Sequence, residues 1–192
     1  MARSSSATAR KSPASKATTR RKASSSTTRK AKPARASKTA TRSREPLSIR
    51  LLKQDHREVE KWFAQYEKLK DDKDKLALFK KIALALKVHT KIENEIFYRE
   101  ERGDVEDDML DEAYVEHDGA RKLIAEIETM KPGDQYYDAK VKVLSEYIKH
   151  HVKEEEQPGG IFAQAKKGHE DLNEMGLRLK ARKEELMGQM AG

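Results

Sequence analysis

Six polar side chains recur at positions where a helical pattern would bury them. Two of them are glutamates, each four residues after a histidine, so each His–Glu pair lies on one helical face. Burying unpaired carboxylates is costly, so two carboxylates among four imidazoles require a shared cationic partner. Nitrogen and carboxylate ligands together suit iron, manganese or zinc. We therefore predict a metal site formed by His56, His89, Glu93, His117, His151 and Glu155.

The spacing of the four histidines supports this interpretation. His56 and His89 are 33 residues apart, and His117 and His151 are 34 residues apart. The second histidine of each pair begins a His-x-x-x-Glu sequence, so the chain reads as one helix-pair unit used twice. A single histidine on a buried helical face is more often a hydrogen-bonded core residue than a ligand. The repeated register of six polar residues favours metal binding over that structural role.

Four amphipathic stretches carry these residues and predict the fold. Short connectors join the stretches, and Gly103 and Gly133 stand where helices commonly stop. We predict an all-α fold, an antiparallel up-down-up-down four-helix bundle. Apolar residues recur at alternating spacings of three and four, as in helices that bury one face, over residues 47–70, 74–102, 105–130 and 134–156.

The chain divides into three predicted parts. Residues 1–45 form a disordered basic tail, residues 46–165 the bundle, and residues 166–192 a helical extension. Within the bundle, the periodicity places Ile96 on the buried face that carries Glu93. The charged segment after residue 160 predicts one last helix that packs against the bundle.

The first 44 residues differ sharply in composition from the rest. They contain 14 Lys and Arg, no acidic residue and no aromatic residue, and Ala is their only apolar type after Met1. Such a segment cannot bury enough apolar surface to offset the entropy of ordering. We expect it to bind DNA or RNA nonspecifically through charge, without base stacking. The cations at the centre of this tail are Arg20, Arg21, Lys22, Arg29, Lys30 and Lys32.

Composition also excludes several classes of protein. The chain has no cysteine, which excludes disulfides, thiolate metal sites and a cysteine nucleophile. No apolar run approaches the roughly 18–20 residues that span a bilayer, and no apolar segment resembles a secretory signal. We expect a cytoplasmic protein without a membrane partner. The Arg- and Ser-rich start leaves a mitochondrial transit peptide as the alternative, although it lacks an amphipathic apolar face.

The register of the six polar residues closely resembles that of the hemerythrin-like, or HHE cation-binding, domain over about residues 48–165. The resemblance implies a four-helix bundle around two iron ions in a non-haem, oxo- or hydroxo-bridged centre. It implies that the four histidines are terminal ligands and that Glu93 and Glu155 bridge the irons. Zinc or manganese remains an alternative to iron. The implied ligand is O₂, NO or peroxide, which the protein would bind or sense.

One position departs from the oxygen carriers of that family. Those proteins carry a second histidine four residues after the first ligand of the third helix, and here that position is Arg121. An iron with fewer protein ligands has more open positions or recruits another donor, for which Tyr114 and Glu112 are candidates. We expect Tyr114 to serve in core packing and Glu116 to face solvent. His150 is expected at the surface, and the run of residues 154–156 to hold an acceptor for a ligand imidazole.

Two kinds of function follow from this reading. The first is a binding protein or sensor for a small ligand. The alternative is a di-iron enzyme or iron-handling protein that removes peroxide, oxidises ferrous iron or stores it, in protection against oxidative stress. No separate acid–base group stands out in the sequence, which favours binding over turnover. A basic tail on nucleic acid would place either activity beside a molecule that iron-driven radicals damage.

Overall fold

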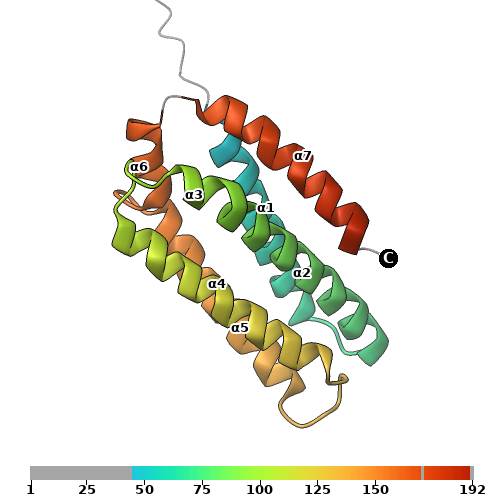
Figure 1. Cartoon of the computed structure of the whole chain (residues 1–192). Helices are drawn as coiled ribbons and strands as arrows, with labels where there is room; N and C mark the ends of the chain where they lie inside the picture. Colours follow the sequence, from blue (N-terminus) through green and yellow to red (C-terminus); the bar gives the residue numbers. More distant parts are fainter. Residues whose placement is uncertain (1–44, 170, 191–192) are drawn as a thin grey trace, which may run out of the picture. The chain divides into compact units, whose positions relative to one another are not determined.

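The computed structural model describes residues 45–169 and 171–190, and the regular elements in these ranges are all helices (Figure 1). The prediction of an all-α fold is confirmed for this part of the chain. The predictions for residues 1–44, including the six named cations of the tail, lie outside the described residues. The elements are α1 (Leu47–Tyr66), α2 (Asp72–Ile92), the π-helical turn η1 (Glu93–Phe97), α3 (Tyr98–Glu100), α4 (Asp107–Glu128), α5 (Tyr137–Glu156), α6 (Ile161–Gly168) and α7 (Leu172–Met190).

The ends of the helices follow local chemistry. Pro46 precedes α1, where its missing N–H costs nothing. The side chain of Asp71 accepts hydrogen bonds from the backbone N–H groups of Lys73 and Asp74, at 2.9 and 3.1 Å, and so caps α2. Gly103 and Gly133 have φ angles of +97° and +92°, which L side chains rarely adopt, and both follow helix ends as predicted.

Four long helices surround the core. Helix α1 packs against α2 and α5, and α4 packs against α5 and α2. In Figure 1, α4 and α5 lie side by side along their length. The apolar core is divided into two clusters, and the six predicted ligands lie between them. On α1, for example, Leu52 belongs to one cluster and Val59 to the other, with His56 between them. On α4, Ala113 and Ala120 flank His117 in the same way.

A π-helical turn changes the register after α2. The N–H of Tyr98 donates to the carbonyl oxygen of Glu93, five residues back, so this turn contains one residue more than an α-helical turn. Phe97 and Tyr98 are consequently fully buried, whereas Ile96 is only half-buried. Ile96, predicted on the buried face, packs against a core cluster but is only partly buried, because a period of 3.6 residues does not hold through the π turn.

The C-terminal segment forms two helices where the sequence predicted one. Backbone in an extended conformation at His169 separates α6 from α7. Helix α6 buries Ile161, Phe162 and Ala165 in the core, and α7 packs against α1 and α2. No helix in the described ranges combines the length and the apolar character that crossing a membrane requires.

Gly176 sets the closest approach between α7 and α1. A Cβ atom at this position would lie 2.5 Å from the backbone nitrogen of Ser48 and 2.7 Å from Cβ of Leu47. A backbone neighbour cannot rotate away, so the two helices would have to separate. Gly188, on the same helix, has open space where its Cβ would stand.

These two glycines make a matched pair for a stability test. Gly176→Ala should lower the free energy of unfolding by about 1–3 kcal/mol, because overpacking forces the helices apart. Gly188→Ala should leave it unchanged or raise it by up to about 1 kcal/mol, through helix propensity alone. Urea denaturation of the full chain, followed by circular dichroism in one metal state, measures both. Equal effects of the two substitutions would contradict the close packing of α7.

Candidate metal centre

The six predicted ligands come together at one level of the bundle. They lie on α1, α2, η1, α4 and α5, and none is more than 6% exposed to solvent. Four are imidazoles, which meet in two pairs. The Nε2 atoms of His56 and His89 lie 3.0 Å apart, and those of His117 and His151 also lie 3.0 Å apart.

The outer nitrogen of each imidazole has its own acceptor. A neutral imidazole whose Nδ1–H donates outward presents the lone pair of Nε2 inward, which is the arrangement of a histidine that binds a metal. When the imidazoles are neutral, as a metal site requires, all four Nε2 lone pairs therefore face the centre of the bundle. The acceptors are Glu156 Oε1 for His56 (2.8 Å), Asp55 Oδ2 for His89 (3.5 Å), Asn94 Oδ1 for His117 (2.7 Å) and Glu116 Oε2 for His151 (2.6 Å).

The carboxylate of Glu93 lies between the two imidazole pairs. Its Oε2 atom is 3.0 Å from Nε2 of His89, in the first pair, and 3.4 Å from Nε2 of His117, in the second. The side chain is fully buried, and neither oxygen has a hydrogen-bond partner in the part of the chain that the structure describes. A carboxylate in this position needs a positive charge on each side.

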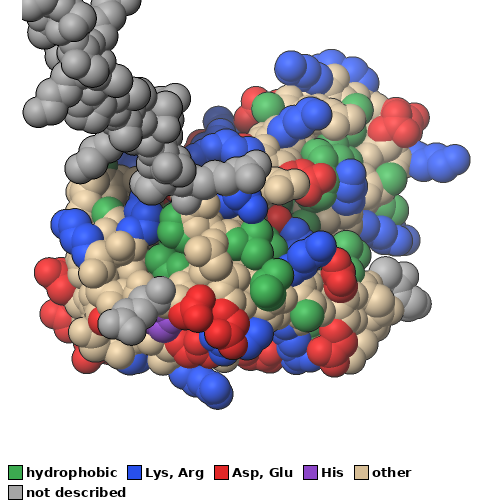
Figure 2. Space-filling model, turned by 90° about the horizontal axis from the view of Figure 1, so that it is seen from above, with side chains coloured by type: hydrophobic (Ala, Val, Ile, Leu, Met, Phe, Trp, Pro, Cys, Tyr) green, Lys and Arg blue, Asp and Glu red, His purple; other side chains and the backbone are tan. Residues whose placement is uncertain are grey.

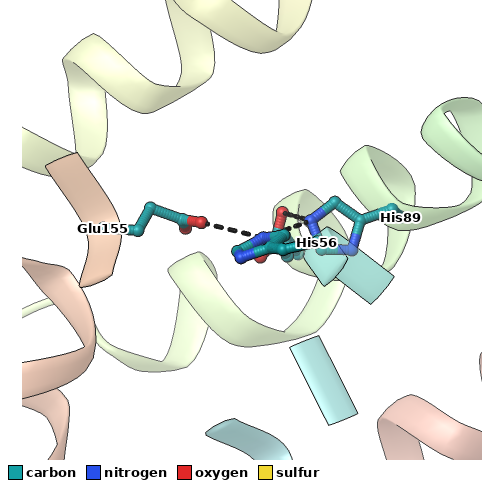
Figure 3. A group of neighbouring side chains, drawn as sticks. His56, His89 and Glu155 are labelled. Atoms are coloured by element: carbon teal, nitrogen blue, oxygen red, sulfur yellow. Dashed lines mark hydrogen bonds and ion pairs between the residues drawn. The ribbon is translucent and has the colours of Figure 1, made fainter. Parts of the chain in front are cut away.

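Glu155 occupies the corresponding position from α5. Its Oε2 atom is 3.2 Å from Nε2 of His56 and 3.7 Å from Nε2 of His151. Figure 3 shows this carboxylate pointing at the ring of His56, with His89 beside it. The hydroxyl of Tyr98 donates to the other oxygen, Oε1, at 2.7 Å. Each carboxylate therefore touches one histidine of each pair.

The spacing of these atoms fits a bound cation. Ligand atoms bonded at about 2.1 Å to one ion lie about 3 Å apart when they subtend a right angle. Two nitrogen lone pairs at that separation repel unless a cation or a proton lies between them. One ligand atom from each of His56, His89, Glu93 and Glu155 lies within 4.8 Å of the others, and Glu93 forms a second such group with His117 and His151. The donor set could therefore hold metal.

The charges in the cluster also favour a cation. Burial disfavours an imidazolium ion, but the carboxylates of Glu93 and Asp55 outweigh burial and raise the pKa of His89 to about 10. Burial and repulsion by Glu155 raise the pKa of Glu93. Burial also favours a higher pKa for Glu155, but the histidines His151, His56 and His89 outweigh burial and lower this pKa. A metal ion must displace protons from these imidazoles, so its affinity falls as the pH falls.

The supporting acceptors follow the same repeat as the ligands. In each helix pair, the residue before the first histidine accepts from the second histidine: Asp55 from His89, and Glu116 from His151. The residue after each glutamate accepts from the first histidine of the other pair, as Asn94 and Glu156 do. Extending the comparison of the two halves by one residue would have found these acceptors in the sequence.

Several sequence predictions are corrected or refined by the structure. Glu116 does not face solvent: it is 8% exposed and turned toward α5, where it accepts from His151. Tyr114 donates its hydroxyl to the backbone oxygen of Asn94 and packs against Tyr98, in keeping with the expected packing role.

Three further predicted residues lie at the surface. Glu112 is exposed, and Arg121 is also exposed and pairs with Asp118 of its own helix at 3.3 Å. Neither Glu112 nor Arg121 belongs to the buried groups of ligand atoms. His150 is exposed, as expected. Among residues 154–156, Glu156 is the acceptor for a ligand imidazole.

Tyr98 and Lys183 are site residues that the sequence did not reveal. Burial raises the pKa of Tyr98 well above its usual value, so its hydroxyl stays protonated and donates to Glu155. Its position depends on the π turn, which has no signature in hydrophobic periodicity. Lys183, on α7, forms an ion pair with Asp55, and so connects the C-terminal helix to the acceptor of His89. A distant lysine on a charged helix gives no local signal in the sequence.

Two hollows adjoin the cluster. The first lies against the four histidines and offers about 10 Å³ in which the centre of a water molecule could stand. Its walls include the apolar side chains of Val59, Leu86, Ile148 and Val152. It has room for about one molecule of that size. The second has about 90 Å³, and Glu112, Glu116 and Glu154 line it together with His151 and Glu155.

Comparisons with known proteins were made for the whole chain. A search of curated proteins and a search of solved structures found no match. The sequence model of one family, described as the hemerythrin HHE cation binding domain, matches residues 47–158, more than half of the 192 residues. All six residues of the buried His/Glu cluster lie within the matched range. The chain belongs to the hemerythrin HHE cation-binding domain family.

Proposed function

We propose that the cluster holds two iron ions, one at each imidazole pair, and that the protein binds or senses O₂, NO or peroxide. The observation that carries the proposal is the position of Glu93 and Glu155, each of which touches one histidine of both pairs. We include in this proposal the antiparallel up-down-up-down order of the four long helices, which the short connectors predict. Carboxylates that bridge two ions suit iron, with zinc or manganese as the alternatives.

The size of the inner hollow supports a small ligand. About 10 Å³ beside the histidines admits a molecule no larger than water or a diatomic gas. Iron bound there would supply open coordination positions and redox chemistry. The chain itself supplies apolar walls that exclude bulk water, acceptors that orient the imidazoles, and the hydroxyl of Tyr98, which holds Glu155 in place. Arg121, at the surface, leaves the second pair without the extra histidine of the oxygen carriers.

Removing a proposed ligand should lower both metal content and stability. His56→Ala and Glu93→Ala should each lose most of the bound iron, measured by elemental analysis of the purified full chain. The metal-dependent gain in unfolding free energy should fall as well, by about 2.7 kcal/mol if metal stands at 100 times its dissociation constant. His150→Ala is the matched control, because this exposed histidine neighbours His151 and should change neither value. Unchanged iron in both ligand variants would contradict the assignment.

The ligand is identified by absorption spectroscopy of the iron-loaded protein. Addition of O₂ or NO to the reduced protein, or of peroxide to the oxidised protein, should change the visible charge-transfer bands with a stoichiometry of about one per centre. We expect His56→Ala to abolish the change and His150→Ala to keep it. A wild-type protein that contains less than about one iron per chain would overturn the proposal.

The outer hollow supports a second candidate, iron handling or peroxide removal. Three glutamates line this hollow together with His151 and Glu155, and such a group of carboxylates attracts cations. This arrangement suits the entry of ferrous iron for oxidation or storage, within protection against oxidative stress. Against turnover stands Tyr98, whose raised pKa makes it a poor proton donor at neutral pH.

Turnover and binding are separated by kinetics. An enzyme would consume peroxide, or oxidise ferrous iron, over many cycles at a rate well above that of free iron, whereas a binding protein responds once per centre. If the outer hollow is an entry route, Glu112→Gln with Glu154→Gln should slow iron loading without changing the final iron content. A single stoichiometric response, with loading unchanged in this variant, would reject the second candidate.

We further propose that the basic segment of residues 1–44 holds the protein on nucleic acid in the cytoplasm. Its 14 cations carry no acidic residue among them. On the face of the helical part shown in Figure 2, by contrast, basic and acidic side chains are interspersed, which gives no continuous positive surface there. The tail is therefore the stronger candidate for contact with phosphates.

Neutralising the tail in the full chain tests this contact. Replacing the six tail cations named above by glutamine should weaken DNA binding in gel-shift assays. It should also reduce the slope of log affinity against log salt by up to about 0.9 for each lost phosphate contact. Equal loss of affinity in this tail variant and in the control variant described next would contradict a tail-specific contact. The matched control replaces six exposed lysines of the helices by glutamine: Lys61, Lys68, Lys80, Lys122, Lys142 and Lys149.

A further inference from the structure

Glu101 is a buried carboxylate that the metal centre does not use. It is the C-cap residue of α3, its side chain is 0% exposed, and neither of its carboxylate oxygens has a hydrogen-bond partner in the described ranges. Its backbone oxygen accepts from the N–H groups of Asp104 and Val105 and fixes the turn, but this leaves the carboxylate itself unsatisfied. An isolated buried carboxylate costs several kcal/mol, so the position calls for a partner.

Two other ligand-type side chains face this carboxylate. Nδ1 of His169, between α6 and α7, lies 3.8 Å from Oε1 of Glu101 and 3.5 Å from Oδ2 of Asp104. One ligand atom from each of the three residues lies within 4.8 Å of the other two. Gly168 allows this approach, because a Cβ atom there would lie 2.6 Å from Oδ1 of Asp104. The histidine is 20% exposed and Asp104 36% exposed, so the group is reachable from solvent.

The electrostatics of the group are those of a cation site. Burial, with repulsion from Asp104 and Glu100, raises the pKa of Glu101 to about 7. Two carboxylates share the group with one imidazole, so its net charge is negative when Glu101 is ionised. A divalent ion within reach of all three ligand atoms would offset it fully.

We propose that Glu101, Asp104 and His169 form a second, mononuclear site for a divalent first-row transition metal ion, separate from the centre in the bundle. Two carboxylate oxygens and one imidazole nitrogen suit Zn²⁺, Mn²⁺ or Fe²⁺. The exposed side of the group leaves the remaining positions to water. The ion would connect the turn after α3 to the segment between α6 and α7, and would stabilise the attachment of these two segments to each other.

A third cluster, Glu116, His150 and Glu154, offers a useful comparison. Its imidazole is 60% exposed, and Glu116 already accepts from His151 of the metal centre. It has no fully buried, unsatisfied carboxylate, so it lacks the feature that carries the proposal. His150→Ala removes it and is the matched control.

The test is a titration of the iron-loaded full chain with Zn²⁺, followed by isothermal calorimetry and by thermal unfolding. We expect one Zn²⁺ per chain beyond the iron, and a rise in melting temperature when it binds. Asp104→Asn and His169→Ala should weaken this binding by more than about tenfold, because losing even a group that supports a ligand costs about 10–100-fold. His150→Ala should bind as the wild type does.

Glu101→Gln keeps the size of the side chain and separates metal binding from folding. This variant should fold, and its melting temperature should not rise with Zn²⁺, which would mark Glu101 as a ligand. Zn²⁺ binding that is unchanged in both Asp104→Asn and His169→Ala would overturn the proposal. Equal loss in His150→Ala and His169→Ala would also overturn it, since it would indicate adventitious binding at surface histidines. Every variant is compared with the wild type in the same iron-loaded state, and the iron centre is tested separately by the loss of iron in His56→Ala.

Discussion

The burial of two carboxylates among four imidazoles is the constraint on which the rest of the fold depends. Glu93 and Glu155 are fully buried, and three of their four oxygens have no hydrogen-bond partner in the described ranges. A hydrophobic core cannot contain such a layer unless positive charge balances it. The apolar residues accordingly form two clusters, one on each side of the layer, so the bundle has two cores joined by a charged plane.

The helical part of this arrangement could be predicted from the sequence because one period governs it. Apolar residues and the six polar residues share the spacing of an α-helix, so the pattern that locates the helices also brings the six side chains to one level. The turns at Gly103 and Gly133, which follow the ends of α3 and α4, were equally local, since they depend on backbone conformation at single residues. The boundaries differ by a few residues: α1 ends at Tyr66 rather than at residue 70, whereas α2 begins at Asp72, two residues before the predicted start.

The rest of the site depends on contacts that a helical period does not encode. Tyr98 reaches Glu155 because the π turn adds one residue, and that residue shifts everything after Glu93 by about a quarter of a turn. Glu116 lies beside the buried stripe and was expected in solvent, yet the neighbouring helix α5 covers it. Lys183 acts across the molecule, from a helix that the sequence placed only in general terms.

The ion pair between Lys183 and Asp55 gives the two halves of the cluster different surroundings. Asp55 accepts from His89 and pairs with α7, whereas its counterpart Glu116 lines the outer hollow. The charge on His89 and the docking of α7 therefore share one carboxylate. By thermodynamic reciprocity, the docking of α7 and the binding of a cation at the first imidazole pair stabilise each other by the same free energy. Helix α7 therefore affects the equilibrium of cation binding at the site, although it contributes no predicted ligand.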